Sequence, residues 1–550
     1  MRIIDSITWY DSETTGISKS LDQILQFASI KTDKDLNIIP GTETNIMCKP
    51  RPDIVPHPKA FLTHHLDMDI LKSAGMNEFM LARTVGNIFS SNSNNGIAGY
   101  NTESFDNEMV RNLFFRNMKD LYEHEWKDGN FKFDLFPLVQ MTYAFRPEIL
   151  QWQNKNDGST SLKLEHLAES NGVIHQNAHD ALSDVEATIG LAKIIKESNP
   201  KLFEYAMRMT DKREISTLFH ARNPLLHVNT LYGQDHNLMT PIMPMAIDLD
   251  NKNKYINLDL RHDPSIILDL SDEDIKKFMY TKRDELPQDA PKIPIVNIQS
   301  NKQPNIVDLN SFVKNGEVIE KARIDLDKVN QNVAFINANK QELIKRLQSS
   351  MRSEPNNEHR DPYKSIYTSG FIHKDDQVSR AQLHYKGSRD MNDQSLVIEK
   401  CSVHSTSVNM RDSVRHHELI LRAKWNSFYE KLLTEDFSPT ELCEYTSYLN
   451  HALFEGLGDV LTIPEYREEI KKVEMEMSLT DDQQIILSKL TKHVDSLEKL
   501  SISLNELAKT IYSKSDNEMD LNPDINKIRA LIRTELYKDE HECESNTVSC

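Results

Sequence analysis

The chain of 550 residues has little cysteine and no long apolar segment. Its five cysteines are odd in number and form no C-x-x-C pair, which argues against a disulfide framework or a zinc site and suits a reducing cytoplasm. No apolar run approaches the roughly 20 residues that a bilayer span needs. The N-terminus lacks the apolar segment of a secretory signal. We therefore expect a cytoplasmic protein without a membrane segment.

An excess of positive charge is also absent. The chain carries 65 Lys+Arg against 84 Asp+Glu, a formal net charge of −19. A broad basic face for double-stranded nucleic acid is therefore not expected, although a narrow channel with a few placed cations remains open. With 38% hydrophobic and 27% charged residues the composition is globular, and the length predicts two to four domains.

The first 200 residues alternate strand-like and helix-like patterns, which predicts an α/β domain over residues 1–200 with helices on a mixed sheet. The expected strands cover residues 7–10, 24–30, 45–48 and 96–100. The expected helices cover residues 79–89, 107–122, 134–145, 162–170 and 179–197.

Two further changes of pattern follow. Short β-type runs at 224–228, 245–249, 255–260 and 293–298 predict a small barrel-like β domain over residues 201–353. Residues 358–480 are expected to be helical, and residues 481–550 to form a helical extension with a polar tail. In that extension a three–four spacing predicts a long helix that packs on a partner helix; its apolar positions are Leu490, Val494, Leu497, Leu504 and Ile511.

The first chemical motif is Asp11-Ser12-Glu13, directly after the apolar run Ile7-Thr8-Trp9 and before a turn. In a strand, residues i and i+2 point to the same face, so the two carboxylates stand side by side. Such a pair repels itself unless a cation lies between the acids, and Mg²⁺ prefers oxygen ligands. The motif alone is more often two solvated acids on an edge strand.

Two further acidic positions lie at helix starts. Asp106 lies between an expected strand and the next helix, where the commonest role of Asp is that of a helix N-cap. Asp184 lies inside an expected helix, off its apolar face, and His179 lies five residues earlier, at the start of that helix, from where it would project toward a site that Asp184 helps to build. Taken alone, His179 and Asp184 would be a surface pair.

The order D-x-E, then D, then H-x₄-D is the DEDDh signature of the proofreading-type exonucleases, which have an RNase H-like fold. Further motifs resemble bacterial exodeoxyribonuclease I over roughly residues 3–475. They include Tyr10–Thr14, Gly99-Tyr100-Asn101, Arg146-Pro147-Glu148, Leu164–Leu167, Asn177–Ala181 and Tyr367–Phe371. The resemblance implies an exonuclease domain, then a small Src-homology-3-like β domain and an all-α domain around a groove for single-stranded DNA.

The resemblance also implies a reaction. We expect 3′→5′ hydrolysis of single-stranded DNA to deoxynucleoside 5′-monophosphates, with two Mg²⁺ ions per site that Mn²⁺ can replace. Asp11 and Asp184 would hold the metal that carries the attacking water, and Asp11 would bridge to the second metal. Glu13 would bind metal and the terminal sugar hydroxyl, Asp106 would bind through water, and His179 would be the general base.

For DNA binding, the resemblance points to Arg111, Tyr122, Trp126 and Lys163, since cations meet phosphates and aromatic faces stack on unpaired bases. The four-residue spacing of Tyr122 and Trp126 is equally typical of helix core. Three departures from the family pattern are Lys163 in place of Arg, Gln140 in place of a basic residue, and His64-His65 in place of Thr-Gly.

A partner and a biological role are expected by resemblance alone. Arg146, Arg222 and Lys282 would bind the acidic C-terminal tip of single-stranded DNA-binding protein, in DNA repair or recombination, and the chain would be a monomer. Two alternatives stay open. One is an exoribonuclease or proofreading-type exonuclease with the same site, and the other is a non-catalytic scaffold that binds nucleic acid.

Overall fold

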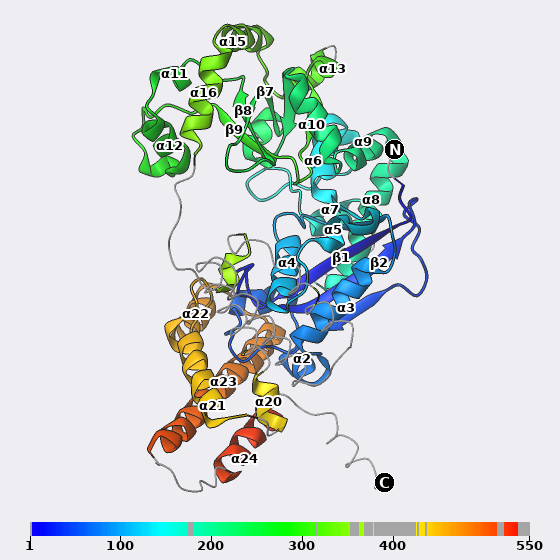
Figure 1. Ribbon diagram of the computed structural model, residues 1–550. Coiled ribbons are helices and arrows are strands. Elements are labelled where there is room, and N and C mark those ends of the chain that lie inside the picture. Colours follow the sequence, from blue (N-terminus) through cyan, green and yellow to red (C-terminus); the bar gives the residue numbers. More distant parts are fainter. Residues whose placement is uncertain are drawn as a thin grey trace.

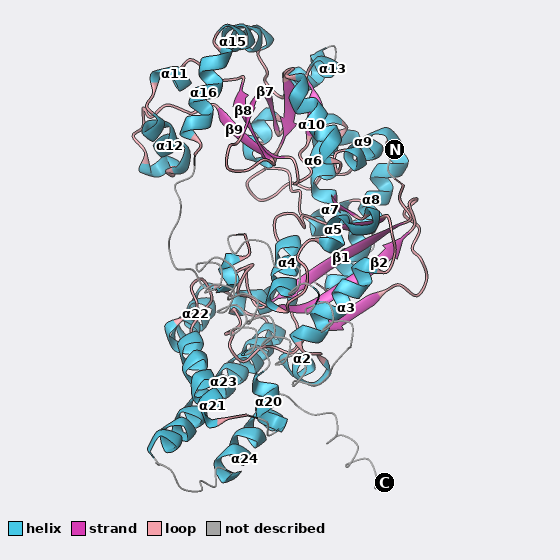
Figure 2. Cartoon of the chain, in the orientation of Figure 1, coloured by secondary structure: helices cyan, strands magenta, loops and turns pink. Residues whose placement is uncertain are grey.

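The computed structural model describes residues 3–173, 180–313, 316–352, 362–367, 378, 425, 428–434, 437–513 and 522–536. Two sheets and a separate group of helices follow one another along the chain (Figure 1). Figure 2 shows that the strands are confined to the first two of these parts. None of the helices within the described ranges combines the length and hydrophobicity of a membrane-spanning segment.

The first sheet has five strands in the order β3-β2-β1-β4-β5. β1 is central, antiparallel to β2 and parallel to β4. The sheet is therefore mixed, as predicted. The strands are β1 (Ser6–Thr14), β2 (Ile24–Thr32), β3 (Thr44–Met47), β4 (Asn95–Gly99) and β5 (Phe131–Asp134).

Helices cover both faces of this sheet because β1 buries alternate side chains on opposite sides. Trp9 lies in one hydrophobic cluster with Val185 of α8, and Tyr10 lies in another with Phe89 of α3. The helices of this part are α1 (Pro58–His64), α2 (Met68–Ala74), α3 (Glu78–Ser90), α4 (Asp106–Arg116), α5 (Glu123–Trp126), α6 (Leu135–Phe145), α7 (Leu164–Ser170), α8 (Ala181–Ser198) and α9 (Pro200–Arg208).

Local sequence explains most of these elements but not all. The predicted apolar face of α8, from Ala181 to Ile195, is buried. The expected helix 107–122 is wrong in its last turn: α4 ends at Arg116, and Met118 adopts a left-handed φ of 57° that ends the helix. Strand β5 and helices α1 and α2 were not predicted.

The second sheet is antiparallel throughout, in the order β10-β6-β7-β8-β9. The strands are β6 (Leu225–Val228), β7 (Met239–Ile247), β8 (Lys254–Asp259), β9 (Ile295–Gln299) and β10 (Ile306–Asp308). The helices around it are α10 (Lys212–Ala221), α11 (Ile266–Asp269), α12 (Asp272–Tyr280), α13 (Asn310–Val313), α14 (Gly316–Lys321), α15 (Leu326–Ala338) and α16 (Lys340–Ser350).

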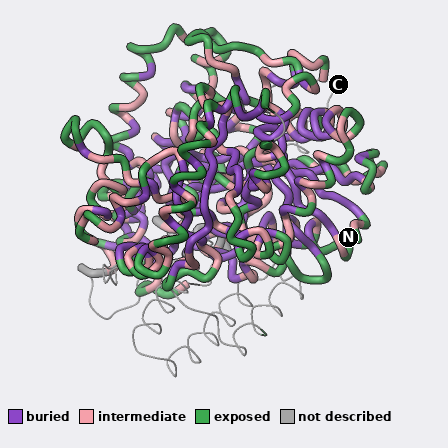
Figure 3. The backbone as a smooth tube through the Cα atoms, turned by 90° about the horizontal axis from the view of Figure 1, so that it is seen from above, coloured by how far each residue is buried: buried purple, intermediate pink, exposed green. Residues whose placement is uncertain are grey.

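One hydrophobic core runs through the first two parts. Phe133 and Leu138 of the first sheet region share a cluster with Leu226 and Val228 of β6. In the view from above, buried backbone accordingly forms a continuous interior beneath exposed outer loops (Figure 3). The two sheets are therefore held in a fixed relation by packed side chains, not by the connecting chain alone.

The third part is helical. Its described helices are α20 (Phe428–Thr434), α21 (Pro439–Asn450), α22 (Ile463–Glu476), α23 (Asp481–Ser513) and α24 (Asn522–Leu531). Ser438 with Glu441, and Thr462 with Glu465, form capping boxes that start α21 and α22. The prediction of a long packed helix is confirmed, because the apolar seam of α23 is buried against α21 and α24.

Candidate active site

Three carboxylates converge where β1 ends. Asp11 and Glu13 come from β1 and Asp184 from the first turns of α8. One oxygen of each lies within 4.8 Å of the others, which makes them the one group of metal-ligating side chains found among the described residues. Since β1 is the central strand, the edge-strand alternative for the Asp11–Glu13 pair is wrong. Three hard oxygen donors in this geometry suit a divalent cation such as Mg²⁺.

The end of β1 is irregular at this point. The pairing of β1 with β2 shifts between Glu13 and Thr14, so the ladder has a bulge directly after the second acid. His64, at the end of α1, contacts the carbonyl of Thr14 through Nε2 at 3.2 Å. Its Nδ1 accepts a hydrogen bond from the Leu66 N–H at 3.0 Å, so Nε2 carries the proton that it donates to Thr14. One His of the His64-His65 pair therefore holds the end of β1.

The start of α8 is tied to the sheet by Asp180. Its carboxylate caps α8 by accepting from the Ser183 N–H, and it also accepts from Gln26 Nε2 of β2 at 3.2 Å. Asp184 follows one turn later, so the cap fixes how far Asp184 extends toward β1. His179 lies outside the described residues, and its role as general base stays a prediction.

Asp106 is the first residue of α4, and Phe105 is the N-cap, so the interpretation of Asp106 as a helix cap is wrong. Its Oδ1 instead accepts a 2.6 Å hydrogen bond from Ser12 Oγ. A Cβ on Gly99 would lie 2.5 Å from the carbonyl oxygen of Tyr10. Only glycine permits this close approach of β4 to β1, which brings the following loop and Asp106 beside the acids of β1.

The electrostatics of the site favour a bound cation. Burial, together with the charges of Asp106 and Glu13, raises the pKa of Asp11 well above its usual range. Burial and Asp184 do the same to the pKa of Glu13. Burial raises the pKa of Asp106 to about 6, against the opposing effect of the Ser12 hydrogen bond. A divalent ion among these acids would relieve their mutual repulsion.

The predicted DNA contacts differ in how accessible they are. Trp126 is 64% exposed at the end of α5, so for Trp126 the helix-core interpretation is wrong. Tyr122 is half-buried, and the Arg111 guanidinium lies 5.5 Å from its ring centroid. Arg111 is buried and paired with Glu108 and Glu125, both at 2.6 Å. Arg111 is thus occupied by two carboxylates in this structure.

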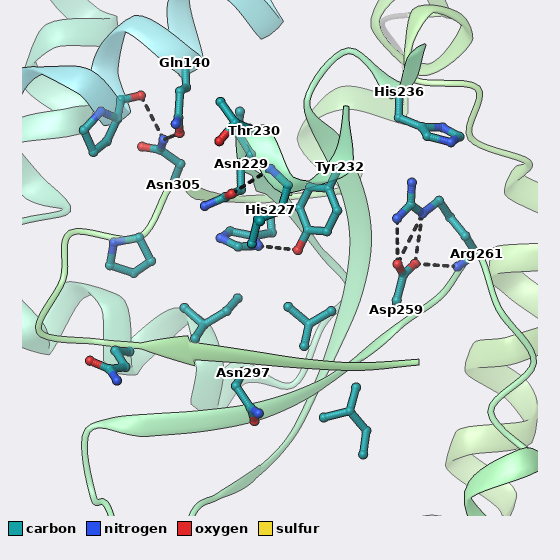
Figure 4. A pocket seen from close by; sticks show the side chains of 18 of the residues that line it. Gln140, His227, Asn229, Thr230, Tyr232, His236, Asp259, Arg261, Asn297 and Asn305 are labelled. Carbon is teal, nitrogen blue, oxygen red and sulfur yellow. Dashed lines mark hydrogen bonds and ion pairs between the residues drawn. The ribbon is translucent and has the colours of Figure 1, made fainter. Parts of the chain in front are cut away.

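The side chain of Lys163 is 63% exposed, and its Nζ lies 3.0 Å from Glu165 Oε1. Gln140 is buried and binds Asn305 of the second sheet region, with Asn305 Nδ2 3.2 Å from Gln140 Oε1 (Figure 4). At position 140 an uncharged polar side chain thus forms part of the contact between the two sheet regions. The four DNA contacts remain predictions.

The three residues expected to bind a partner protein come from the ends of three different helices. Arg146 is exposed at the end of α6, Arg222 caps α10 with a left-handed φ of 53°, and Lys282 follows α12. Figure 1 shows α10 and α12 on opposite sides of the second sheet. The prediction of a partner site from these cations stays untested.

A cavity of about 1180 Å³ lies between the two sheets (Figure 4). Its lining includes Asn101 and Asp134 on one side and Arg261 and Gln303 on the other. The hydrogen-bonding roles of Asp134, Gln303 and Ser12 were not predicted from the sequence. The one available signal was the position of Asp134 directly before a helix, which is typical of an N-cap. Their hydrogen bonds connect segments that are far apart in sequence.

Two family models match the chain. One, described as "Exonuclease", covers residues 8–192, and one described as "Exonuclease I SH3-like domain" covers residues 210–352. Together with the acidic cluster on a mixed sheet, they define a metal-dependent exonuclease. Exodeoxyribonuclease I of Haemophilus influenzae is 32% identical over 426 residues, which span 77% of this chain and 86% of that protein. The chain belongs to the exonuclease I family.

Other relatives agree with this assignment. Exodeoxyribonuclease I of Escherichia coli K12 is 35% identical over 306 residues, spanning 55% of this chain and 64% of that protein. Exonuclease I from Methylocaldum szegediense has a solved structure with a TM-score of 0.79 and 30% identity, covering 90% and 99% of the two chains. The E. coli enzyme in complex with a dA16 oligonucleotide has a TM-score of 0.77 and 25% identity, covering 90% and 100%.

Proposed function

We propose that this chain is a 3′→5′ exonuclease that degrades single-stranded DNA to deoxynucleoside 5′-monophosphates, with Mg²⁺ as its metal. The observation that carries the proposal is the convergence of Asp11, Glu13 and Asp184 within 4.8 Å at the end of β1. Membership of the exonuclease I family supports the polarity and the substrate. The complex of the E. coli relative with dA16 supports single-stranded DNA in particular.

The acidic cluster could hold a divalent ion, and our proposal extends this to two ions. Asp11 and Asp184 would hold one ion, Asp11 and Glu13 the second, and Asp106 would bind through water. Bound divalent ions supply Lewis acidity, which lowers the pKa of a water and stabilises a leaving oxygen. No protein nucleophile is required for this hydrolysis.

The chain's own residues would do the remaining work. His179 would accept a proton from the attacking water, because an imidazole pKa of about 6.5 lies near working pH. Glu13 would orient the terminal 3′ hydroxyl. Ser12 donates a hydrogen bond to one oxygen of Asp106 and so holds this carboxylate beside β1.

Binding of the strand would use the exposed face of α5 and the start of α7. Trp126 offers an exposed ring for stacking on a base, and Lys163 offers an exposed cation for a phosphate. Arg111 would reach phosphate only by exchanging a carboxylate partner, because Glu108 and Glu125 occupy its guanidinium. Arg111 would therefore contribute to DNA binding by holding the Tyr122 ring in place at least as much as by direct contact with a phosphate.

The wider proposal is that the chain acts as a monomer in DNA repair or recombination and binds the acidic tail of single-stranded DNA-binding protein. The cations offered for this are Arg146, Arg222 and Lys282. Triple substitution to Ala should weaken binding of a tail peptide while leaving hydrolysis of a naked oligomer unchanged. Unchanged peptide binding would remove these residues from the partner site.

The experiment that tests the reaction compares matched DNA and RNA oligomers, each single-stranded and duplex, in the presence of Mg²⁺. We expect shortening of single-stranded DNA from its 3′ end. Preferential digestion of RNA would favour the exoribonuclease alternative, because metal chemistry at a phosphodiester does not itself distinguish the sugars. Binding of divalent metal and DNA with no cleavage would favour the non-catalytic scaffold.

A further inference from the structure

A glutamine from the second sheet region binds the edge strand of the first sheet. Gln303 lies in the loop between β9 and β10 and is 7% exposed. Its Oε1 accepts from the backbone N–H of Asp134 at 2.8 Å, and its Nε2 donates to the Asp134 carbonyl at 2.9 Å. Asp134 ends β5, an edge strand of its sheet. The side-chain amide therefore pairs with the two backbone groups that a further strand would occupy.

The side chain of Asp134 in turn holds the loop that follows β4. Its Oδ1 accepts the backbone N–H of Asn101 at 2.7 Å, and its Oδ2 accepts that of Glu103 at 3.0 Å. Asn101 has a left-handed φ of 61°, a conformation that Asn adopts more readily than most residues with a Cβ. Asp134 also caps α6 by accepting from the Phe136 N–H. One buried carboxylate thus fixes both a helix start and the turn of the neighbouring loop.

That loop leads directly into the acidic site. The Thr102 carbonyl accepts the backbone N–H of Asn107 at 2.9 Å, which couples the turn to the first turn of α4. Asp106 begins α4 and receives the Ser12 hydrogen bond beside Asp11 and Glu13. A continuous series of hydrogen bonds and short loop segments therefore runs from Gln303 to the carboxylates.

We propose that Gln303 is a positioning residue for the nuclease site. It acts through Asp134 and the loop 101–105 on Asp106, so the second sheet region contributes to the geometry of the acids although it supplies no ligand. The inference rests on the proposed function for its role in hydrolysis. How well the loop 101–105 is ordered can be measured without substrate.

A matched control lies two residues further along the chain. Asn305 is also buried, at 4% exposed, and its Nδ2 donates across the same contact between the two sheets. Its acceptors are the Pro137 carbonyl at 2.8 Å and Gln140 Oε1 at 3.2 Å, within α6 (Figure 4). Asn305→Ala therefore removes comparable hydrogen bonds that do not lead to the loop 101–105.

The test compares Gln303→Ala, Asn305→Ala and the full-length wild type. The first readout is amide hydrogen exchange of the peptide that spans residues 100–107, and the second is Mn²⁺ affinity of the DNA-free protein by calorimetry. Gln303→Ala should exchange about tenfold faster in this peptide and bind Mn²⁺ a few-fold more weakly. Asn305→Ala should match the wild type in both. Equal effects of the two substitutions, or no effect of Gln303→Ala, would overturn the proposal.

Two additions keep the test decisive. Gln303→Met retains side-chain volume without hydrogen bonds, so it replaces Gln303→Ala if that variant fails to fold. In steady-state digestion, either Gln303 variant should lower kcat with little change of KM for single-stranded DNA, when kcat is expressed per active molecule counted from the Mn²⁺ stoichiometry. General destabilisation would lower only the active fraction and leave this corrected kcat unchanged. If the wild type cuts no DNA, the proposed function fails, while hydrogen exchange and Mn²⁺ binding still decide the role of Gln303.

Discussion

Ser12 Oγ donates a 2.6 Å hydrogen bond to Asp106 Oδ1 and so joins β1 to the start of α4. Ser12 lies between the two acids of β1, and Asp106 lies 94 residues further along the chain. The bond offsets part of the effect of burial on the Asp106 carboxylate. It therefore keeps the fourth acid of the site both in place and more readily ionised.

This relationship gives the first prediction. Ser12→Ala should lower kcat about tenfold, because a hydrogen bond to a charged group contributes roughly 1.5–3 kcal/mol. The matched control is Ser6→Ala on the same strand, which removes an equally buried bond to Asn95 Oδ1. Steady-state hydrolysis of a single-stranded oligomer measures both. Equal losses in the two variants would mean that only the stability of β1 is affected.

The second prediction concerns the converging acids. Asp11→Asn and Asp184→Asn should each reduce turnover by about three orders of magnitude or more, since each would remove one of the charged ligands proposed for the metal. Thermal unfolding should show an intact fold, because less like charge is then buried. Asp35→Asn, at an exposed surface acid, is the control and should leave turnover unchanged. Substantial activity in either site variant would remove that residue from the metal site.

The third prediction concerns the general base. His179→Ala should lower kcat by about 10²–10⁴-fold while metal affinity and DNA binding persist, since a base acts on the water and not on either ligand. His175→Ala, a nearby histidine in the same segment, serves as the control. Turnover at the wild-type rate in His179→Ala would refute the assigned base.

The fourth prediction concerns binding of the strand. Trp126→Ala should weaken the binding of single-stranded DNA and raise its Kd about tenfold, since stacking on one base contributes roughly 1–3 kcal/mol. Its exposed ring implies little loss of stability. Met475→Ala, an exposed apolar residue of α22, is the control. Fluorescence anisotropy without divalent metal measures binding alone, and an unchanged Kd for Trp126→Ala would exclude stacking at this ring.

The fifth prediction concerns pH. Burial lowers the pKa of His124 to about 4, where its ring stacks on Phe89 at 5.4 Å. An unfolded histidine titrates near pH 6.5, so between about pH 6.5 and 4 the unfolded chain binds more protons. The contribution of His124 to stability is therefore complete above about pH 6.5 and is lost as pH falls toward 4, by about 3 kcal/mol in all.

His124→Phe should make the melting temperature fall less steeply between pH 7 and pH 5. Phe retains the ring contacts, and within the described part of the chain Nδ1 of His124 has no hydrogen-bond partner to lose. The exposed His451→Gln serves as the control. A variant as sensitive to acid as the wild type would show that His124 does not carry this part of the pH dependence.

The elements that could be predicted from the sequence are those specified by local pattern. The alternation of β1 placed Asp11 and Glu13 on one face, and the helical period of α8 separated Asp184 from the buried stripe. The pairing of Ser12 with Asp106 and of Gln303 with Asp134 could not be predicted. Each depends on segments brought together by tertiary packing, across 94 and 169 residues respectively.

Predictions at element ends failed for a physical reason as well. The helix expected over 107–122 stops at Arg116 because Met118 turns into the left-handed region and Asp120 accepts the backbone N–H groups of Tyr122 and Glu123. That turn starts the short helix α5 and leaves Trp126 exposed. Helix propensity alone would have buried this ring in a longer helix.

The most direct test of the account is digestion of a 5′-labelled single-stranded DNA oligomer, with Mg²⁺ and with chelator, beside its duplex form. We predict a ladder that shortens from the 3′ end, requires metal and favours the single strand. An oligomer that stays intact with folded, metal-loaded protein would contradict it, and the three converging acids would then belong to a protein that binds DNA without cutting it.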